Sequence, residues 1–245
     1  MHSFSISSIN NDYTYGIQVF VPDEPVPTDG FPVVYVLDGL GYFHFLRDAV
    51  RLQCRNAPRT GVGAAVVVGI CHDEDSMRMR RFYDFTAPAT EYSFPKRMAS
   101  RIPEKVGGGA DFQRFIEEEL KPKIEAEFPI NRNKQTLFGH SLGGYFVLWN
   151  LLNAASYQNY IAISPSLWWN DHELMKQSLK QEWEGHRLFI GVGEKEGFMV
   201  EDARLFAGKM RSLKMNIDYC MAEEENHASV VPTVMSRALR FVNSK

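Results

Sequence analysis

The chain has 245 residues, enough for one sizeable hydrophobic core, and we expect a single domain over residues 1–245. Its hydrophobic fraction of 44% and charged fraction of 23% are ordinary for a globular protein, and a formal net charge of -3 argues against a general role in binding nucleic acid or membrane surfaces. The sequence shows neither a signal-peptide pattern nor a run of 18 apolar residues, and its three widely spaced cysteines are typical of reduced thiols, so we expect a soluble cytoplasmic protein.

Seven segments rich in valine, isoleucine and aromatic residues are predicted to be strands. They are residues 15–21, 32–37, 64–70, 135–138, 160–163, 187–192 and 217–221. Two of them, PVVYVL at 32–37 and AAVVVGI at 64–70, are almost continuously apolar, which is typical of parallel strands covered by helices on both faces.

Three segments carry the patterns of helices. In residues 111–128 apolar side chains recur every three or four positions, with Asp111 as a candidate N-cap and Pro122 expected to kink or split the helix. Residues 142–154 and 201–213 are the other two. Strands that alternate with helices predict an α/β fold, with a mostly parallel sheet after an antiparallel opening.

The segment TLFGHSLGG, residues 136–144, is a Gly-x-Ser-x-Gly motif between a predicted strand and a predicted helix. This arrangement is a nucleophile elbow, in which a tight turn exposes the serine hydroxyl at a helix N-terminus. We expect the glycines on both sides of Ser141 to be required because a β-carbon there would collide with the adjacent strand or helix. The motif predicts that Ser141 is a catalytic nucleophile.

A serine hydroxyl needs a base to take its proton, and in α/β hydrolases the order along the chain is serine, acid, histidine. Three histidines follow Ser141: His172, His186 and His227. His227 comes after the last predicted strand, in a polar loop, so it is the predicted base. We interpret His172 and His186 as surface side chains.

The acid should follow the strand at 187–192, where both Glu194 and Glu196 are available. We favour Glu196 because a position further along the loop reaches His227 more easily. Asp38 is a rival by residue type, but its place in the chain favours a role in shaping its loop.

Two backbone N–H groups are expected to stabilise the oxyanion that forms when a serine attacks an ester. Leu142, directly after the nucleophile, should supply one. We expect the second from Leu40, in the loop after the strand at 32–37.

Six segments together resemble the esterase D family of α/β hydrolases, over nearly the whole chain. They are residues 35–39, 81–86, 108–112, 139–143, 164–169 and 226–227. The resemblance implies an α/β-hydrolase fold, with helices on both faces of the sheet, and a serine esterase activity. Residues 81–86 and 164–169 are the more discriminating and imply the branch that hydrolyses siderophore trilactones of the enterobactin or bacillibactin type. Residues 37–40 also resemble a loop of the mycolyltransferase relatives, which supports Leu40 as an oxyanion donor.

A ferric tris-catecholate is anionic and has flat aromatic faces, so its binding site should offer arginine and indole groups. Arg78, Arg80 and Arg81 fall in a predicted loop after one strand, and Trp168 and Trp169 follow another. As substrate-binding residues we favour Arg78, Arg81 and Trp168. Solvent exposure of Arg78 and Arg80, pairing of Arg81 with Asp84 and structural packing of Trp168 are the alternatives.

The expected partner is therefore a small-molecule ester, with a ferric siderophore as the candidate implied by the resemblance. The run His72-Asp73-Glu74-Asp75 lacks the separated ligands of a closed metal site, and we expect neither a metal nor any other cofactor. The alternative functions are a feruloyl or carbohydrate acyl esterase, a thioesterase similar to S-formylglutathione hydrolase, and a non-catalytic ligand-binding relative. The sequence does not predict an oligomeric state.

Overall fold

The computed structural model describes residues 1–94, 105–179 and 183–243. Within these residues eight strands form one sheet, in the order β1-β2-β4-β3-β5-β6-β7-β8. The strands are β1 His2–Ser8, β2 Tyr13–Phe20, β3 Phe31–Val36, β4 Val66–Cys71, β5 Ile130–His140, β6 Asn159–Ile163, β7 Arg187–Gly193 and β8 Asn216–Ala222.

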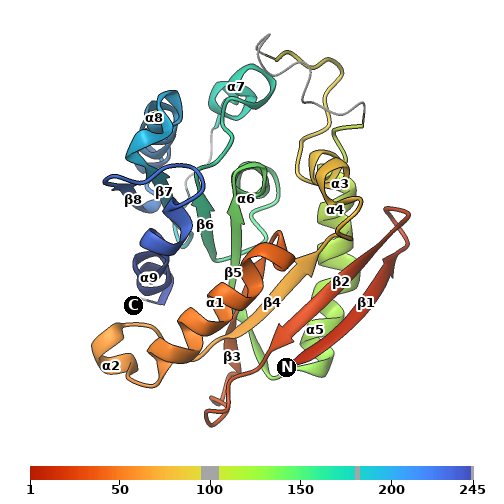
Figure 1. Cartoon of the computed structure of the whole chain (residues 1–245), viewed down its shortest axis with the longest axis vertical. Helices are drawn as coiled ribbons and strands as arrows, with labels where there is room; N and C mark the ends of the chain where they lie inside the picture. The colour runs from red at the N-terminus through yellow and green to blue at the C-terminus, as the bar shows by residue number, and fades with distance from the viewer. Residues whose placement is uncertain (95–104, 180–182, 244–245) are drawn as a thin grey trace.

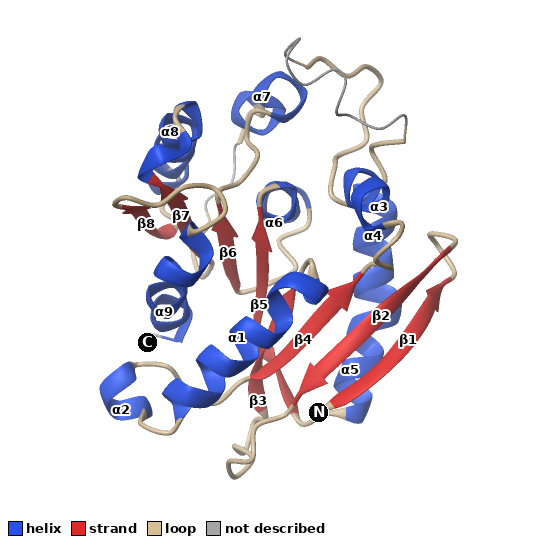
Figure 2. Ribbon diagram, viewed as in Figure 1, coloured by secondary structure: helices blue, strands red, loops and turns tan. Residues whose placement is uncertain are grey.

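The sheet is antiparallel at one edge and parallel elsewhere. β1 pairs antiparallel with β2, and β2 pairs antiparallel with β4, whereas every pairing from β4 through β8 is parallel. The arrowheads of β5 and β6 point toward the same end of the molecule in Figure 2. In a parallel sheet that carboxyl edge is where ligands bind, so the residues following β5, β6 and β7 are placed together.

Helices cover both faces of the sheet. The helical segments are α1 Gly39–Cys54, α2 Ala57–Thr60, α3 Met77–Asp84, α4 Gly109–Arg114, a π-helical segment Phe115–Leu120, α5 Lys121–Glu127, α6 Leu142–Asn153, α7 Trp169–Lys176, a 3-10 turn Glu194–Glu196, α8 Phe198–Ser212 and α9 Val230–Asn243. Figure 1 shows α1 and α9 in front of the strands and α4 and α5 behind them.

Alternate residues of the central strand β3 serve two separate cores. Val33 and Tyr35 pack into the core that includes residues of α4, α5, α6 and α8, whereas Val34 and Val36 pack into the core beneath α1 and α9. This two-sided burial is why the parallel strands are nearly continuous apolar runs. The predicted α/β-hydrolase fold, with its antiparallel opening, is confirmed.

The structure differs from the predicted elements in three places. β1 was not predicted, because its outer residues are largely polar and exposed. The helix expected over residues 111–128 is divided by the π-helical segment Phe115–Leu120, just ahead of Pro122, whose ring and missing N–H disfavour regular α-helical hydrogen bonding. The arginines at 78, 80 and 81 lie on the short helix α3 rather than in a loop.

Candidate active site

Ser141 occupies the strained turn between β5 and α6. Its φ of 59° and ψ of -119° lie in a region that non-glycine residues rarely adopt. A β-carbon on Gly139 would come within 2.3 Å of the Gly143 carbonyl oxygen, so glycine is required there. At Gly143 the expected collision is absent: the nearest atoms outside the helix backbone lie 3.5 Å away, and the tight position is the next one, Gly144, at 3.0 Å from the Ile163 carbonyl oxygen.

The structure brings Ser141, His227 and Glu196 into one chain of hydrogen bonds. His227 Nε2 lies 3.0 Å from Ser141 Oγ, and His227 Nδ1 lies 2.6 Å from Glu196 Oε2. Since an ionised carboxylate only accepts, Nδ1 carries the proton and Nε2 can accept one from the serine hydroxyl. This is the geometry of a nucleophile, a general base and an orienting acid.

Glu196 is held in place by two further donors. Ser164 Oγ and the Gly193 N–H each donate to Glu196 Oε1, at 2.6 Å. Burial raises the pKa of this carboxyl, but the hydrogen bonds from His227, Ser164 and Gly193 outweigh burial and leave the pKa below its usual value. Glu196 is therefore a carboxylate at neutral pH. Glu194 is exposed, and its Oε2 accepts a bond from the Glu224 N–H, 2.9 Å away.

The two residues expected to hold an oxyanion both lie in the first turn of a helix. Leu142 is the first residue of α6 and Leu40 is the second residue of α1, where the sequence analysis expected a loop. N–H groups in a first helical turn have no acceptor within the helix and point along the favourable end of its dipole. Leu40 also lines the cavity that contains Ser141 and His227.

That cavity has a volume of about 760 Å³ and opens on the nucleophile. Its lining residues are Asp38, Leu40, Gly41, Tyr42, Glu74, Met77, Arg81, His140, Ser141 and His227. Most of them come from α1, from α3 and from the turn before α3, so these elements form the wall opposite the triad.

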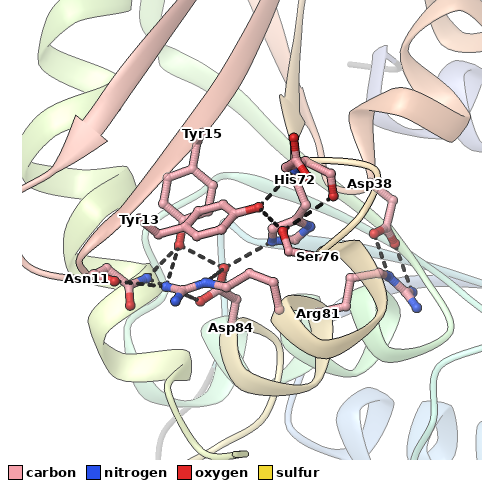
Figure 3. Close-up of polar contacts among 10 residues, drawn as sticks. Asn11, Tyr13, Tyr15, Asp38, His72, Ser76, Arg81 and Asp84 are labelled. Atoms are coloured by element: carbon pink, nitrogen blue, oxygen red, sulfur yellow. Dashed lines mark hydrogen bonds and ion pairs between the residues drawn. The ribbon is translucent and has the colours of Figure 1, made fainter.

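Arg81 lines this cavity as an ion pair with Asp38, not with Asp84. Its Nε and Nη2 atoms lie 2.5 Å and 2.9 Å from the two Asp38 carboxylate oxygens. Asp38 precedes α1 with a left-handed φ of 54° and therefore shapes this turn, as expected. Figure 3 shows the pair beside α3, with the group around Asp84 on the other side of the helix.

Asp84 is the centre of that second group. The carboxylate is fully buried and accepts hydrogen bonds from Tyr15 Oη at 2.7 Å, from Arg80 Nε at 3.0 Å and from Asn11 Nδ2 at 3.2 Å. His72 Nε2 lies 3.0 Å from it. Solvent exposure was one expectation for Arg80. Its bonds to Asp84, to the Asn11 carbonyl oxygen and to Tyr15 Oη instead hold α3 against β2.

The other two candidate substrate-binding residues lie outside the lining of the cavity. Arg78 is exposed on α3. Trp168 is half-buried directly before α7, with its ring centroid 6.0 Å from that of Trp169, and Trp169 is fully buried in the core. Of the three, the structure brings only Arg81 to the cavity.

The structure adds residues that the sequence analysis did not select. Ser164, at φ 45° after β6, supports the acid, and Ser166 Oγ lies 3.5 Å from Ser141 Oγ. The sequence feature that could have pointed to Ser164 and Ser166 is the Ser-Pro-Ser string at the end of a predicted strand. It entered the prediction only as part of the family resemblance. Tyr42 and His140 form hydrogen bonds that end on the backbone of His227.

Comparison with known families assigns the chain to a family. Residues 7–230 match the sequence model of the esterase family, described as "Putative esterase". The chain belongs to this esterase family. The esterase activity class expected from the sequence is confirmed.

Relatives of this esterase include siderophore esterases. It is 38% identical over 251 residues to the ferri-bacillibactin esterase BesA of Bacillus subtilis (strain 168), covering 96% of this chain and 87% of BesA. It is 27% identical to the siderophore enterobactin esterase of Emericella nidulans, covering 86% and 82% of the two chains. The crystal structure of the BES protein from Bacillus cereus superposes with a TM-score of 0.90 at 36% identity, covering 100% of this chain and 96% of that one.

Two further features bear on what the esterase can bind. Across the described residues, no group of three or more His, Cys, Asp or Glu side chains is placed to hold a metal ion. The segment His72-Asp73-Glu74-Asp75 is split, because His72 is buried against Asp84 and the three acidic residues are exposed. Each helix that the structure describes is too short or too polar to cross a bilayer.

Proposed function

We propose that this esterase hydrolyses the ester bonds of a catecholate siderophore trilactone through an acyl-enzyme on Ser141. The observation that carries the proposal is the unbroken chain from Ser141 through His227 to Glu196, facing a cavity of about 760 Å³. That volume is in the usual range for sites that bind small molecules. The names of the relatives, ferri-bacillibactin esterase and siderophore enterobactin esterase, supply the substrate class.

The reaction has two stages. In the first, Ser141 Oγ attacks the ester carbonyl carbon while His227 Nε2 takes the hydroxyl proton, and the N–H groups of Leu142 and Leu40 stabilise the oxyanion. The ester C–O bond then breaks, and the protonated His227 returns the proton to the leaving alcohol. In the second stage, His227 takes a proton from water as the water attacks the acyl-enzyme carbonyl carbon. The bond from that carbon to Ser141 Oγ then breaks, and His227 returns the proton to Ser141 Oγ as the acid leaves. Glu196 keeps the imidazole oriented and stabilises its charged form throughout.

The charged residues of the cavity affect how an anionic ferric siderophore can bind. Asp38 offsets the charge of Arg81, and Glu74 is an exposed acidic residue at the wall. A highly anionic ferric complex therefore meets little free positive charge inside the cavity itself. We propose that Arg81 contacts substrate there, and that the exposed Arg78 and the half-buried Trp168 contact parts of a large substrate that extend beyond the cavity.

The test is product analysis by liquid chromatography and mass spectrometry. Bacillibactin and enterobactin, iron-free and ferric, are compared with p-nitrophenyl, feruloyl and S-formylglutathione substrates, using wild-type protein and Ser141→Ala. We expect the linear products of the trilactones to form with a kcat/KM at least about tenfold above the best of the other substrates, and Ser141→Ala to lower every rate by about 10⁴-fold or more. Comparable slow turnover of all substrates would reject the siderophore assignment. Binding without turnover would identify a non-catalytic binder.

A further inference from the structure

His140, the residue just before the nucleophile, is bonded on both sides of its ring. Its Nδ1 lies 2.9 Å from Tyr42 Oη, and its Nε2 lies 3.0 Å from the backbone carbonyl oxygen of His227. The side chain belongs to the last residue of β5 and is buried, at 8% exposure. It therefore joins α1, the nucleophile strand and the loop of the base.

Only one arrangement of protons fits these two bonds. Burial and, to a smaller extent, the neighbouring His227 together lower the pKa of His140 to about 4, against smaller opposing effects that include those of Asp38 and Glu196, so the ring is neutral near pH 7. A carbonyl oxygen only accepts, so the single N–H of His140 is at Nε2. Nδ1 is then an acceptor, and the Tyr42 hydroxyl must donate to it. Tyr42 thus selects the tautomer that can donate to His227.

The loop that carries His227 is also bonded to the turn after β7, by the Lys195 N–H to the Glu225 carbonyl oxygen and by the Glu224 N–H to Glu194 Oε2, each at 2.9 Å, but these bonds hold residues that precede the base. Asn226 and Ser229 close a local turn through the Ser229 N–H to the Asn226 carbonyl and through the Asn226 N–H to Ser229 Oγ. The side chain of His227 is 44% exposed. The bond from His140 attaches the backbone of the base to the rigid centre of the sheet, and the two imidazole centroids lie 4.6 Å apart.

We infer that His140 and Tyr42 are positioning residues that fix the backbone of His227 at hydrogen-bonding distance from Ser141. The inference rests on the proposed roles of Ser141 and His227 but not on the identity of the substrate. Because His140 and Ser141 share a peptide bond, the same short segment of backbone sets the position of the nucleophile and that of its base. A displacement of about 1 Å in such a pair can reduce a rate by about 10²-fold.

The experiment compares kcat and KM for a small aryl ester, p-nitrophenyl acetate, among five variants. His140→Leu removes the donor, His140→Gln keeps an N–H of similar reach, and Tyr42→Phe removes only the hydroxyl; the fourth variant combines His140→Leu with Tyr42→Phe. His186→Leu is the matched control, because His186 Nδ1 also bonds a backbone carbonyl, that of Tyr157 at 2.9 Å, beside the start of β7 and away from the carboxyl edge.

We expect His140→Leu to lower kcat by about 30- to 100-fold, with KM changed less than about threefold. Tyr42→Phe should lower kcat by about 5- to 10-fold and add nothing in the His140→Leu background, because its effect passes through His140. His140→Gln should recover at least about tenfold of the loss. His186→Leu should keep the wild-type kcat even where its melting temperature falls.

Three results would overturn the inference: a His140→Leu kcat within about threefold of wild type, a His140→Gln kcat as low as that of the leucine variant, or additive losses in the double variant. A loss confined to KM would likewise reject positioning and indicate direct substrate contact. If His140→Leu does not fold, an unchanged kcat in Tyr42→Phe still rejects the proposal. Failure of the proposed function is separate, because it would appear as activity retained by Ser141→Ala.

Discussion

Glu194 and Glu196 are two residues apart, yet only the second can act on His227. The 3-10 turn Glu194–Glu196 directs Glu196 inward, where its side chain is 1% exposed and accepts three hydrogen bonds, and leaves Glu194 at the surface. A buried carboxylate with these donors stays ionised, and in the proposed mechanism it stabilises the imidazolium that forms when Ser141 loses its proton.

Replacing each glutamate in turn by glutamine tests which of them orients His227. Glu196→Gln should lower kcat by about 10³- to 10⁴-fold, since the amide removes the negative charge that stabilises the protonated His227. Glu194→Gln should remain within about twofold of wild type. Steady-state kinetics with an aryl ester measures both, and a large loss in the Glu194 variant alone would assign the acid to Glu194.

The three residues that the structure brings together could be selected from the sequence where chain order constrained them. The elbow motif selected Ser141, and the order of acid and base in this fold selected His227 and favoured Glu196. The supporting bonds of Ser164, Tyr42 and His140 could not be predicted, because each depends on how strands and helices meet in three dimensions. The pairing of Arg81 with Asp84 was only an alternative interpretation, and its actual partner, Asp38, could not be predicted for the same reason, since it lies 43 residues away in the chain.

Helix α3 depends on the buried carboxylate of Asp84 for its attachment to the sheet. Arg80 and Asp84 are four residues apart on this helix, and Asp84 also accepts bonds from Tyr15 on β2 and Asn11 in the turn before it. On the same helix Arg81 pairs with Asp38, the residue before α1. The fully buried carboxylate of Asp84 therefore fixes the position of α3, whose residues Met77 and Arg81 line the cavity.

We expect Asp84→Asn to lower the free energy of unfolding by about 3–5 kcal/mol, because Arg80 would keep a partly buried charge without its partner. The matched control is Asp48→Asn, which breaks a half-exposed pair with Arg47 and should cost no more than about 1 kcal/mol. Urea denaturation measures both. Equal losses in the two variants would show that Asp84 does not anchor the helix.

Whole elements were predicted from sequence where burial imposed a pattern. The parallel strands β3, β4, β6 and β7 are almost completely buried and could be found as apolar runs, as could the core-facing helix after residue 111. α3 was missed as a helix because its sequence, MRMRRFYD, is short and mostly polar. It is held by the contacts of Asp84 and Arg80 together with the packing of Phe82 against the core, and neither could be predicted from an apolar pattern.

The three triad residues converge only because the sheet brings the ends of its strands together. Ser141 follows β5, Glu196 follows β7, and His227 follows β8. These strands run parallel, so the segments after them meet at the carboxyl edge of the sheet. The alternation of strands and helices predicted this edge. The cavity opposite the triad, formed by α1 and α3, was not predictable from that alternation.

Intact-protein mass spectrometry after treatment with a fluorophosphonate tests the central claim, that this convergence activates Ser141. We predict a single stoichiometric adduct, located on Ser141 by peptide mapping, absent from Ser141→Ala and formed at least about 10²-fold more slowly in His227→Ala, where no base takes the hydroxyl proton. Wild-type protein that remains unlabelled, or that is labelled at another residue at the same rate in all three proteins, would contradict the account.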